Sequence, residues 1–423
     1  MISARFGTAS LLAGGLMACL LATSARADDQ PVVALEVGKV VTMNARDEVI
    51  NDAVVVIRGA KIVALGKRGQ VEVPEGAEVV RAPKRWLVPG LVDCHNHIAG
   101  SLRDLNDGVF LTNPGLRTVD TLDPENDNLK NAVAGGVTTV LLIPGSGNNL
   151  SGFGTVSRTA GRTVADMTVR SPGSLKIAQA GNPERYWFGV GRSYMNYNLR
   201  QTLVKARAYH QTWERYEKKV QEQGAERAGP APPRDPVWHG FRGLWRKEFP
   251  VSVHTQMYQV VMKTIRMLHD EFGLDVMLDH STFDGYKTAP LVKERQIDTI
   301  VGPRQYFFDR TERAIYGCAE RYYAQGIRKL GINTDAPVVP EEELTLQATI
   351  GCRLGLPPYV ALKGLTIVPA RALGLGDRVG SIEVGKDADL ALWSGDPIDP
   401  RHACHKTWVQ GKLVYDSKKK RRF

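Results

Sequence analysis

The chain has 423 residues, of which 43% are hydrophobic and 24% are charged. This is the composition of a globular protein with a substantial core, and it excludes a disordered or fibrous chain. The formal net charge is +10, and the C-terminal run Lys418–Arg422 supplies five of the positive charges. No nucleic-acid-binding motif accompanies these basic residues, so nucleic acid is not an expected partner.

Residues 1–27 are predicted to be a signal peptide. Arg5 gives a short positive segment, residues 6–23 are apolar or small, and Ala25-Arg26-Ala27 carries the small residues that a signal peptidase requires. A lipoprotein signal ending at Cys19 is the alternative, although Met17 fits that pattern poorly. No later stretch is long and apolar enough to predict a transmembrane segment. We therefore expect a periplasmic or secreted protein.

Residues 28–87 are predicted to form the first part of a small β-sandwich. Val37–Val41, Ala53–Arg58 and Lys61–Leu65 are rich in residues that favour strands. Gly59-Ala60 supplies a tight turn between the last two.

From residue 88 to residue 372, apolar strands alternate with helical stretches, which is typical of a parallel sheet built from βα units. The strands are apolar throughout, as expected for a sheet covered on both faces. Eight candidates are present: Leu91–His97, Val137–Ile143, Met167–Val169, Leu175–Ala178, Val251–His254, Val276–Leu278, Thr299–Val301 and Ile332–Asp335. Eight such repeats predict an α/β fold, a closed (β/α)8 TIM barrel.

Two further segments complete the expected organisation. Residues 185–250 form a helical insertion, a long helix rich in Arg and Lys followed by a proline-rich loop, which is either a surface excursion or a cap over the barrel mouth. Residues 373–423 are again β-like and end in the basic tail. We expect them to pack on residues 28–87 as the second part of a split β-sandwich.

The first candidate strand ends in Asp93-Cys94-His95-Asn96-His97. Residues two apart on a strand share a face, so His95 and His97 point the same way and can bind one metal ion through their imidazole nitrogens. An HxH pair alone is weak evidence, because such pairs also arise by chance on surfaces and in cores.

Three other polar residues strengthen this interpretation. His254, His280 and Asp335 each end an apolar strand, at the face where barrels place their chemistry. Imidazole and carboxylate are the ligands of Zn²⁺ sites that keep an open position for water. Polar groups gathered there without a metal would lose solvation without compensation. The sequence therefore predicts a site for one or two divalent metal ions, Zn²⁺ first among them.

Lys176 lies among apolar residues in the candidate strand Leu175–Ala178. A lysine side chain is rarely buried in a barrel strand unless it has a partner or a function. It can point outward along a helix groove, or pair with Asp335 or another carboxylate. It can also be carboxylated by CO₂ to a carbamate that bridges two metal ions, because a buried lysine readily loses its proton.

The chain resembles the metal-dependent amidohydrolase superfamily, and within it the imidazolonepropionase-like group, over nearly the whole length after the signal segment. Trp86–His97 matches the family's entry to the first barrel strand. Ala134–Val140 resembles its second-strand signature, and Gly380–Leu390 resembles the return into the β-sandwich. The resemblance implies the TIM-barrel fold and a metal-dependent hydrolase.

It also implies roles for the residues above. Asp335 would be ligand and catalytic carboxylate, and Lys176 sits where some members carry the bridging carbamate. Other members lack that lysine and hold one metal ion. The remaining implied ligands are histidines: His95, His97, His254 and His280.

We expect hydrolysis through metal-activated hydroxide, with Asp335 taking the proton of the water as general base and delivering it to the leaving nitrogen. His280, where it is not a tight ligand, would stabilise the developing oxyanion. For the substrate, Arg304 is a candidate clamp for a carboxylate and Tyr286 a candidate wall of the pocket. A surface ion pair and a helix cap are the respective alternatives.

The predicted reaction is hydrolysis of a non-peptide carbon–nitrogen bond in a cyclic amide or a related small molecule. An exported dipeptidase or acyl-amino-acid hydrolase is the first alternative, and phosphotriester or lactone hydrolysis is another, because the scaffold alone does not fix the chemistry. The alternative from a different class is a non-catalytic binding protein, against which the complete ligand set argues. The sequence leaves assembly into a homo-oligomer open.

Overall fold

The computed structural model describes residues 30–100, 106–179 and 181–422. The predicted signal peptide lies outside these residues. Among the helices in the described ranges, none combines the length and the apolar character needed to cross a membrane.

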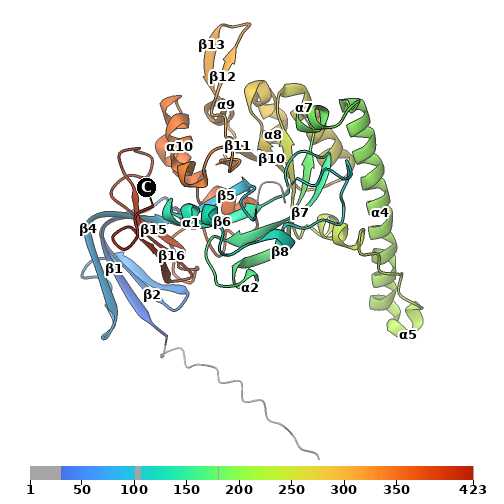
Figure 1. Ribbon diagram of the computed structural model, residues 1–423. Coiled ribbons are helices and arrows are strands. Elements are labelled where there is room, and N and C mark those ends of the chain that lie inside the picture. Colours follow the sequence, from blue (N-terminus) through green and yellow to red (C-terminus); the bar gives the residue numbers. More distant parts are fainter. Residues whose placement is uncertain (1–29, 101–105, 180, 423) are drawn as a thin grey trace, which may run out of the picture.

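An eight-stranded sheet curls into a nearly closed barrel (Figure 1). Its strands, in spatial order, are β5 (Leu91–Asn96), β6 (Val137–Leu142), β7 (Leu150–Arg158), β8 (Thr168–Ala178), β9 (Val251–Thr255), β10 (Val276–His280), β11 (Asp298–Val301) and β14 (Leu330–Ile332). The first and last strands meet where the amide of His97 donates to the carbonyl of Ala336. The predicted TIM barrel is therefore confirmed.

The third barrel strand differs from its prediction. Met167–Val169 and Leu175–Ala178 were expected to be separate strands, but β8 spans nearly all of both. The missing strand is β7, which runs antiparallel to both neighbours and lies in a segment for which no strand was predicted. Ser151, Gly152 and Gly154 give β7 a weak strand signal in the sequence. The structure needs the small residues, because a Cβ at Gly154 would lie 2.8 Å from the carbonyl oxygen of Leu142.

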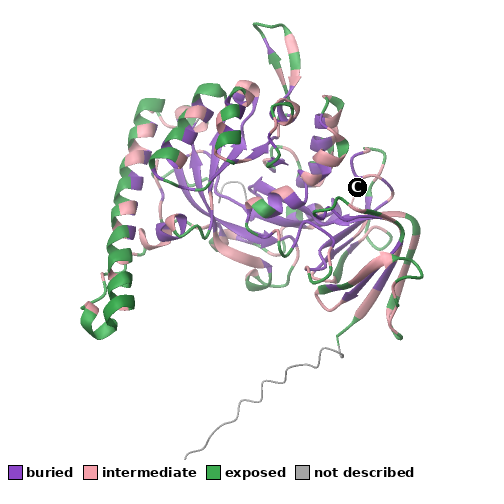
Figure 2. Cartoon of the chain, turned by 180° about the vertical axis from the view of Figure 1, so that it is seen from behind, coloured by how far each residue is buried: buried purple, intermediate pink, exposed green. Residues whose placement is uncertain are grey.

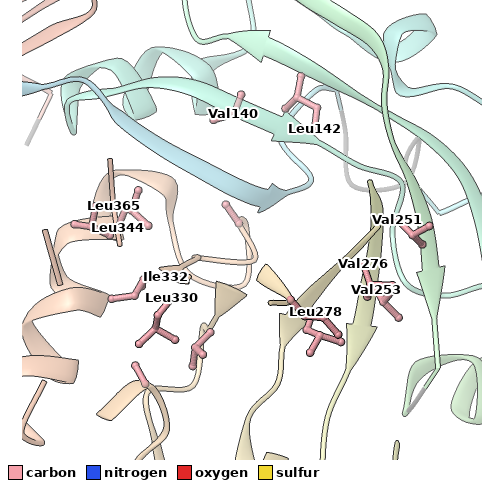
Figure 3. Packing of buried hydrophobic residues seen from close by; sticks show 14 of the residues in the cluster. Val140, Leu142, Val251, Val253, Val276, Leu278, Leu330, Ile332, Leu344 and Leu365 are labelled. Carbon is pink, nitrogen blue, oxygen red and sulfur yellow. The ribbon is translucent and has the colours of Figure 1, made fainter. Parts of the chain in front are cut away.

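Helices and strand side chains pack as one core around the barrel (Figure 3). The labelled strand residues that build it are Val140, Leu142, Val251, Val253, Val276, Leu278, Leu330 and Ile332. The helices are α1 (Asp127–Ala134), α2 (Val164–Met167), α3 (Asn182–Tyr186), α4 (Arg192–Gln223), α5 (Ala225–Ala228), α6 (Arg242–Trp245), α7 (Tyr258–Thr264), α8 (Ala289–Glu294), α9 (Cys318–Ala324), α10 (Leu344–Arg353), α11 (Pro358–Lys363) and α12 (Ile367–Ala372). A hairpin of β12 (Tyr306–Asp309) and β13 (Ala314–Gly317) projects between β11 and α9 (Figure 1).

The long helix α4 lies along the flank of the barrel. Its buried residues fall between Met195 and His210, and its distal half is mostly exposed (Figure 2). Arg200 forms an ion pair with Glu271, and Arg207 stacks over the ring of Phe272, both just before the start of β10. These contacts lie toward the barrel end opposite the strand C-termini. This part of α4 is therefore a surface excursion, whereas the start of the insertion contacts the loop between β6 and β7, where Nε1 of Trp187 donates to the carbonyl of Gly147.

The terminal segments pack together in a second sheet, as the split β-sandwich requires. Its order is β17 (Lys412–Asp416), β16 (Cys404–Val409), β15 (Leu390–Trp393), β4 (Glu78–Pro89), β1 (Val32–Val41), β2 (Val49–Arg58) and β3 (Lys61–Lys67). Antiparallel pairing of β4 with β15 joins the two segments. The sheet has its own apolar core, to which Leu35, Val55 and Trp408 contribute.

Asp389, beside β15, gives a prediction for the pH dependence of stability. Its side chain is 4% exposed, and burial raises its pKa from 3.8 to about 6. A raised carboxyl pKa means that folding penalises the charged form, so the cost appears as pH rises from about 4 to 6 and persists above it. We expect Asp389→Asn to increase the free energy of unfolding at pH 8 by up to about 3 kcal/mol.

Urea unfolding at pH 8 and pH 4 would test this. The gain should vanish at pH 4, where both proteins are neutral at this position. Substitution of the exposed Asp120 by Asn is the control and should change stability at neither pH. A variant less stable than the parent at pH 8 would show that the charge of Asp389 is stabilising.

Candidate metal centre

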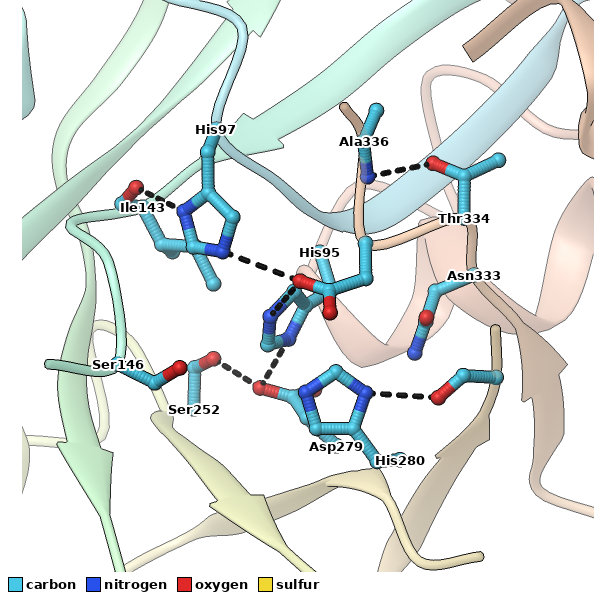
Figure 4. Close-up of polar contacts among 12 residues, drawn as sticks. His95, His97, Ile143, Ser146, Ser252, Asp279, His280, Asn333, Thr334 and Ala336 are labelled. Carbon is cyan, nitrogen blue, oxygen red and sulfur yellow. Dashed lines mark hydrogen bonds and ion pairs between the residues drawn. The ribbon is translucent and has the colours of Figure 1, made fainter. Parts of the chain in front are cut away.

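Six predicted site residues come from five segments at the C-terminal ends of the barrel strands. Figure 4 shows three of them, His95, His97 and His280, close together. The rings of His95 and His280 have centroids 4.4 Å apart, and those of His254 and His280 are 4.3 Å apart. The Nζ atom of Lys176 lies 3.2 Å from Nε2 of His95. Five of the six residues are buried and Asp335 is half-buried; the set is His95, His97, Lys176, His254, His280 and Asp335.

Three of them hold their ligand atoms close together. One donor atom each of His95, His97 and Asp335 lie within 4.8 Å of one another. Oδ1 of Asp335 is 3.1 Å from Nε2 of His97 and 3.2 Å from Nε2 of His95. Two ligand atoms of a tetrahedral Zn²⁺ at the usual bond lengths are about 3.3 Å apart. The spacing therefore fits a shared metal ion.

Hydrogen bonding fixes which ring nitrogens are free to bind. Nδ1 of His97 lies 2.9 Å from the carbonyl oxygen of Ile143, which can only accept, so Nδ1 carries the proton. Burial lowers the pKa of His97, which keeps the ring neutral and leaves a lone pair on Nε2. That lone pair faces the carboxylate of Asp335. Two acceptors at this distance repel each other unless a cation lies between them.

His280 and His254 point to the same conclusion. Nδ1 of His280 donates to the carbonyl of Gly302 over 2.7 Å, and its Nε2 is buried with no hydrogen-bond partner among the described residues. Nδ1 of His254 is buried and likewise without one. Unpaired buried nitrogens are costly, so each is available to a ligand that is not protein.

The charges of the cluster suit metal binding. Burial lowers the pKa of Lys176 to about 8, although Asp279 and Asp335 raise it. Burial also lowers the pKa of His280 to about 4, so its ring is neutral. Burial opposes ionisation of Asp335, but the histidines around it hold the pKa of its carboxyl well below the usual value. A carboxylate and neutral imidazoles are the protonation states that a metal ion requires. His95 differs from the other histidines of the cluster, because burial lowers its pKa but Asp279 and Asp335 raise it above the usual value.

Asp279 is a member of the cluster that the sequence interpretation left out. Its Oδ2 lies 2.9 Å from Nδ1 of His95 and accepts a short hydrogen bond from Ser252 (Figure 4). Adjacent strand residues normally face opposite sides, which argued against both Asp279 and His280 reaching the site. A φ of 66° at His280 breaks the regular strand, and both side chains contact the cluster. The available signal was a carboxylate inside an apolar strand.

Asp93 is a second omission. One carboxylate oxygen accepts from the amide of His95, and the other accepts from the amide and hydroxyl of Thr334. Asp93 thus ties the end of β5 to the segment that carries Asp335 across the seam of the barrel. Asp335 itself has a φ of 52°, a left-handed conformation that is strained for a residue with a side chain.

A prediction follows for Asp279. A carboxylate beside Nδ1 keeps the proton there and presents Nε2 to the metal, so Asp279→Asn should weaken metal affinity by roughly ten- to a hundredfold. Competition with a chelator, followed by metal analysis, measures this. Asp298→Asn is the matched control, a carboxylate on the neighbouring strand but at its opposite end. Equal metal retention in the two variants would exclude this role for Asp279.

The two predicted substrate residues lie beside the hairpin. The guanidinium of Arg304 is 5.4 Å from the ring centre of Phe283. The ring of Tyr286 packs edge-on against Tyr316 and under the guanidinium of Arg321. Their roles in substrate binding stay predictions.

Comparisons with known proteins find amidohydrolases in both sequence and fold. The Amidohydrolase family model matches residues 318–420. An amidohydrolase of Hapsidospora irregularis, tasK, is 27% identical over 403 residues, which cover 86% of this chain but only 40% of that protein. An imidazolonepropionase of Pseudomonas fluorescens is 25% identical over 389 residues, covering 86% of this chain and 92% of the relative.

Among solved structures, an amidohydrolase from Thermotoga maritima has a TM-score of 0.77 at 28% identity, covering 91% of this chain and 100% of that one. The resemblance recognised in the sequence is confirmed by these matches. The chain is thus similar to the amidohydrolase superfamily and to its imidazolonepropionase-like group, and these matches support a hydrolase that acts on carbon–nitrogen bonds.

Proposed function

We propose that the chain is a metal-dependent hydrolase of a non-peptide carbon–nitrogen bond, in a cyclic amide or a related small molecule. The main observation in favour of a metal ion is that the lone pair of His97 Nε2 points at Oδ1 of Asp335 from 3.1 Å. Nε2 of His95 lies 3.2 Å from the same oxygen. The likeness to imidazolonepropionases supports a ring amide as substrate.

The residues fit one or two Zn²⁺ ions. His95, His97 and Asp335 would hold the first, and the free nitrogens of His254 and His280 would complete a second position. When bound, the metal supplies a Lewis acid that lowers the pKa of water and polarises the substrate carbonyl.

Asp335 is the proton carrier of the proposed reaction. Its low pKa makes it a weak base toward free water, and it gains the proton only from a water already made acidic. The protonated carboxyl then delivers that proton to the leaving nitrogen, which restores the carboxylate. Its left-handed backbone directs Oδ1 toward Nε2 of both His95 and His97.

His280 acts as a ligand in this proposal. A donor to an oxyanion must carry a proton on the nitrogen that faces it. The proton of neutral His280 is on Nδ1, which is occupied by Gly302, so Nε2 offers only a lone pair. This argues against the oxyanion role considered from the sequence.

Lys176 is the proposed carbamate. Its neutral amine would attack the carbon of CO₂ and release one proton, leaving an N-carboxylate. At pH 7 a pKa of about 8 leaves about a tenth of the side chains neutral, far more than for an exposed lysine. The anion would offset the positive charge of a second metal ion.

Arg304 and Tyr286 are proposed to bind the substrate, Arg304 through a carboxylate and Tyr286 through its ring. The signal segment supports export to the periplasm or outside the cell.

A substrate panel tests the proposal. Purified mature protein, loaded with Zn²⁺, is assayed against imidazolone-type ring amides, N-acyl amino acids, dipeptides, lactones and phosphotriesters. Ring amides turned over with the highest kcat/KM are the expected result. A preference for dipeptides would move the assignment to a peptidase, and no turnover of any class would favour a binding protein.

A further inference from the structure

A second charged hollow lies at the opposite end of the barrel. It has a volume of about 330 Å³ and is lined by the residues just before β9, by the N-terminal ends of β10 and β11, and by the end of α12 with the residues after it. Val276 of its wall is four residues before His280 on the same strand, about 13 Å along it. The hollow is therefore separate from the metal centre.

Some of the charges in its wall neutralise one another. Lys247 forms an ion pair with Asp275 over 2.7 Å. The guanidinium of Arg295 makes two hydrogen bonds to the carboxylate of Asp270. These cations are satisfied and would gain little from a ligand.

Three other cations in the wall have no such partner. Arg170, Lys329 and Arg371 line the hollow, and none of them forms an ion pair with a carboxylate among the described residues. The nearest fixed contacts of two of them are backbone carbonyls, that of Gly173 for Arg170 and that of Gln296 for Lys329.

Arg170 is the most informative of the three. Its Nε atom is shielded from solvent and has no hydrogen-bond acceptor among the described residues. Burial lowers the pKa of this guanidinium, and no carboxylate offsets that effect. A guanidinium N–H that is shielded from water and has no acceptor is costly, and a planar oxyanion is the group that satisfies it best.

One carboxylate, the side chain of Asp298, shares the hollow and has no hydrogen bond within the part of the chain that the structure describes. Burial raises its pKa to about 6, with Lys329 opposing the shift. Asp298 can therefore take up a proton when an oxyanion binds, which would remove its negative charge from the site. The unpaired charges in the wall remain three cations to one acid.

We propose that this hollow is a binding site for a small oxyanion, a phosphate or carboxylate group held by Arg170 with Arg371 and Lys329. It is independent of the proposed reaction and uses none of the metal-centre residues.

Isothermal titration of the purified protein with inorganic phosphate tests the site, with acetate titrated in parallel to compare the two oxyanions. Arg170→Met and Arg371→Met should each weaken phosphate binding by roughly tenfold or more. Arg295→Met is the matched control, since it removes an arginine from the same wall that already has a partner, and should change binding by less than about twofold.

Phosphate bound at the metal centre would persist in all three variants, so only the difference between them reports on this hollow. Arg170→Lys keeps the positive charge and should bind phosphate with intermediate affinity. This variant keeps the test valid if Arg170→Met fails to fold. Loss of binding in Arg170→Met with retention in Arg295→Met would establish the site. Equal affinities in those two variants, or no phosphate binding by the parent protein, would overturn it.

Discussion

Asp335→Asn should lower kcat by at least about a thousandfold, the scale of losing a positioned acid–base group together with its charge. Asparagine keeps the shape of the side chain but cannot take a proton from water or return it to a nitrogen. It also removes the anion that faces His95 and His97 across about 3 Å. The loss should appear in kcat more than in KM, because the carboxylate acts on the transition state.

Two measurements make this result specific. Thermal unfolding should show that the variant is folded, and Asp399→Asn, which alters an exposed ion pair with Arg401, should retain parental turnover. Parental turnover by Asp335→Asn on the best substrate of the panel would remove Asp335 from the mechanism.

Lys176→Ala has the second largest expected effect. The side chain is fully buried, next to His95, and its carbamate is the proposed anion between two metal ions. Without it we expect the bound metal to fall from two ions per chain to one, and turnover to fall by roughly a hundredfold or more. Metal analysis and kinetics on the same preparation measure both.

Rescue separates a missing anion from general damage. The truncated side chain leaves space for a short carboxylate, so acetate or propionate should restore part of the activity and of the second metal. Lys287→Ala, at an exposed lysine, should need no rescue. A variant that keeps both metal content and turnover without added carboxylate would show that Lys176 is a structural residue.

The barrel could be predicted because most of its strands are continuous apolar runs. β6, β9 and β10 are buried along their whole length, and a strand covered on both faces must be apolar throughout. β7 was not predicted, because Gly152 and Gly154 are required by the close approach of neighbouring backbone. That constraint arises only when the sheet is assembled. Local sequence patterns do not contain that information.

Some residues of the candidate site could likewise be predicted from the sequence and others could not. His95, His97, His254 and Asp335 follow from strand ends and alternation. Asp279 does not, because its place beside His95 depends on the left-handed backbone of His280, which regular alternation does not anticipate. The role of Asp93 depends on closure of the barrel between β5 and β14, a contact between residues 241 positions apart in the chain.

Metal content per chain, measured by mass spectrometry on the purified mature protein before and after reconstitution with Zn²⁺ in bicarbonate, is the experiment to make first. One or two tightly held ions, lost to a chelator together with activity and regained on reconstitution, is the expected result. A protein that binds no metal even after reconstitution, yet is folded, would contradict the proposed metal centre and leave the five converging ligand side chains without an explanation.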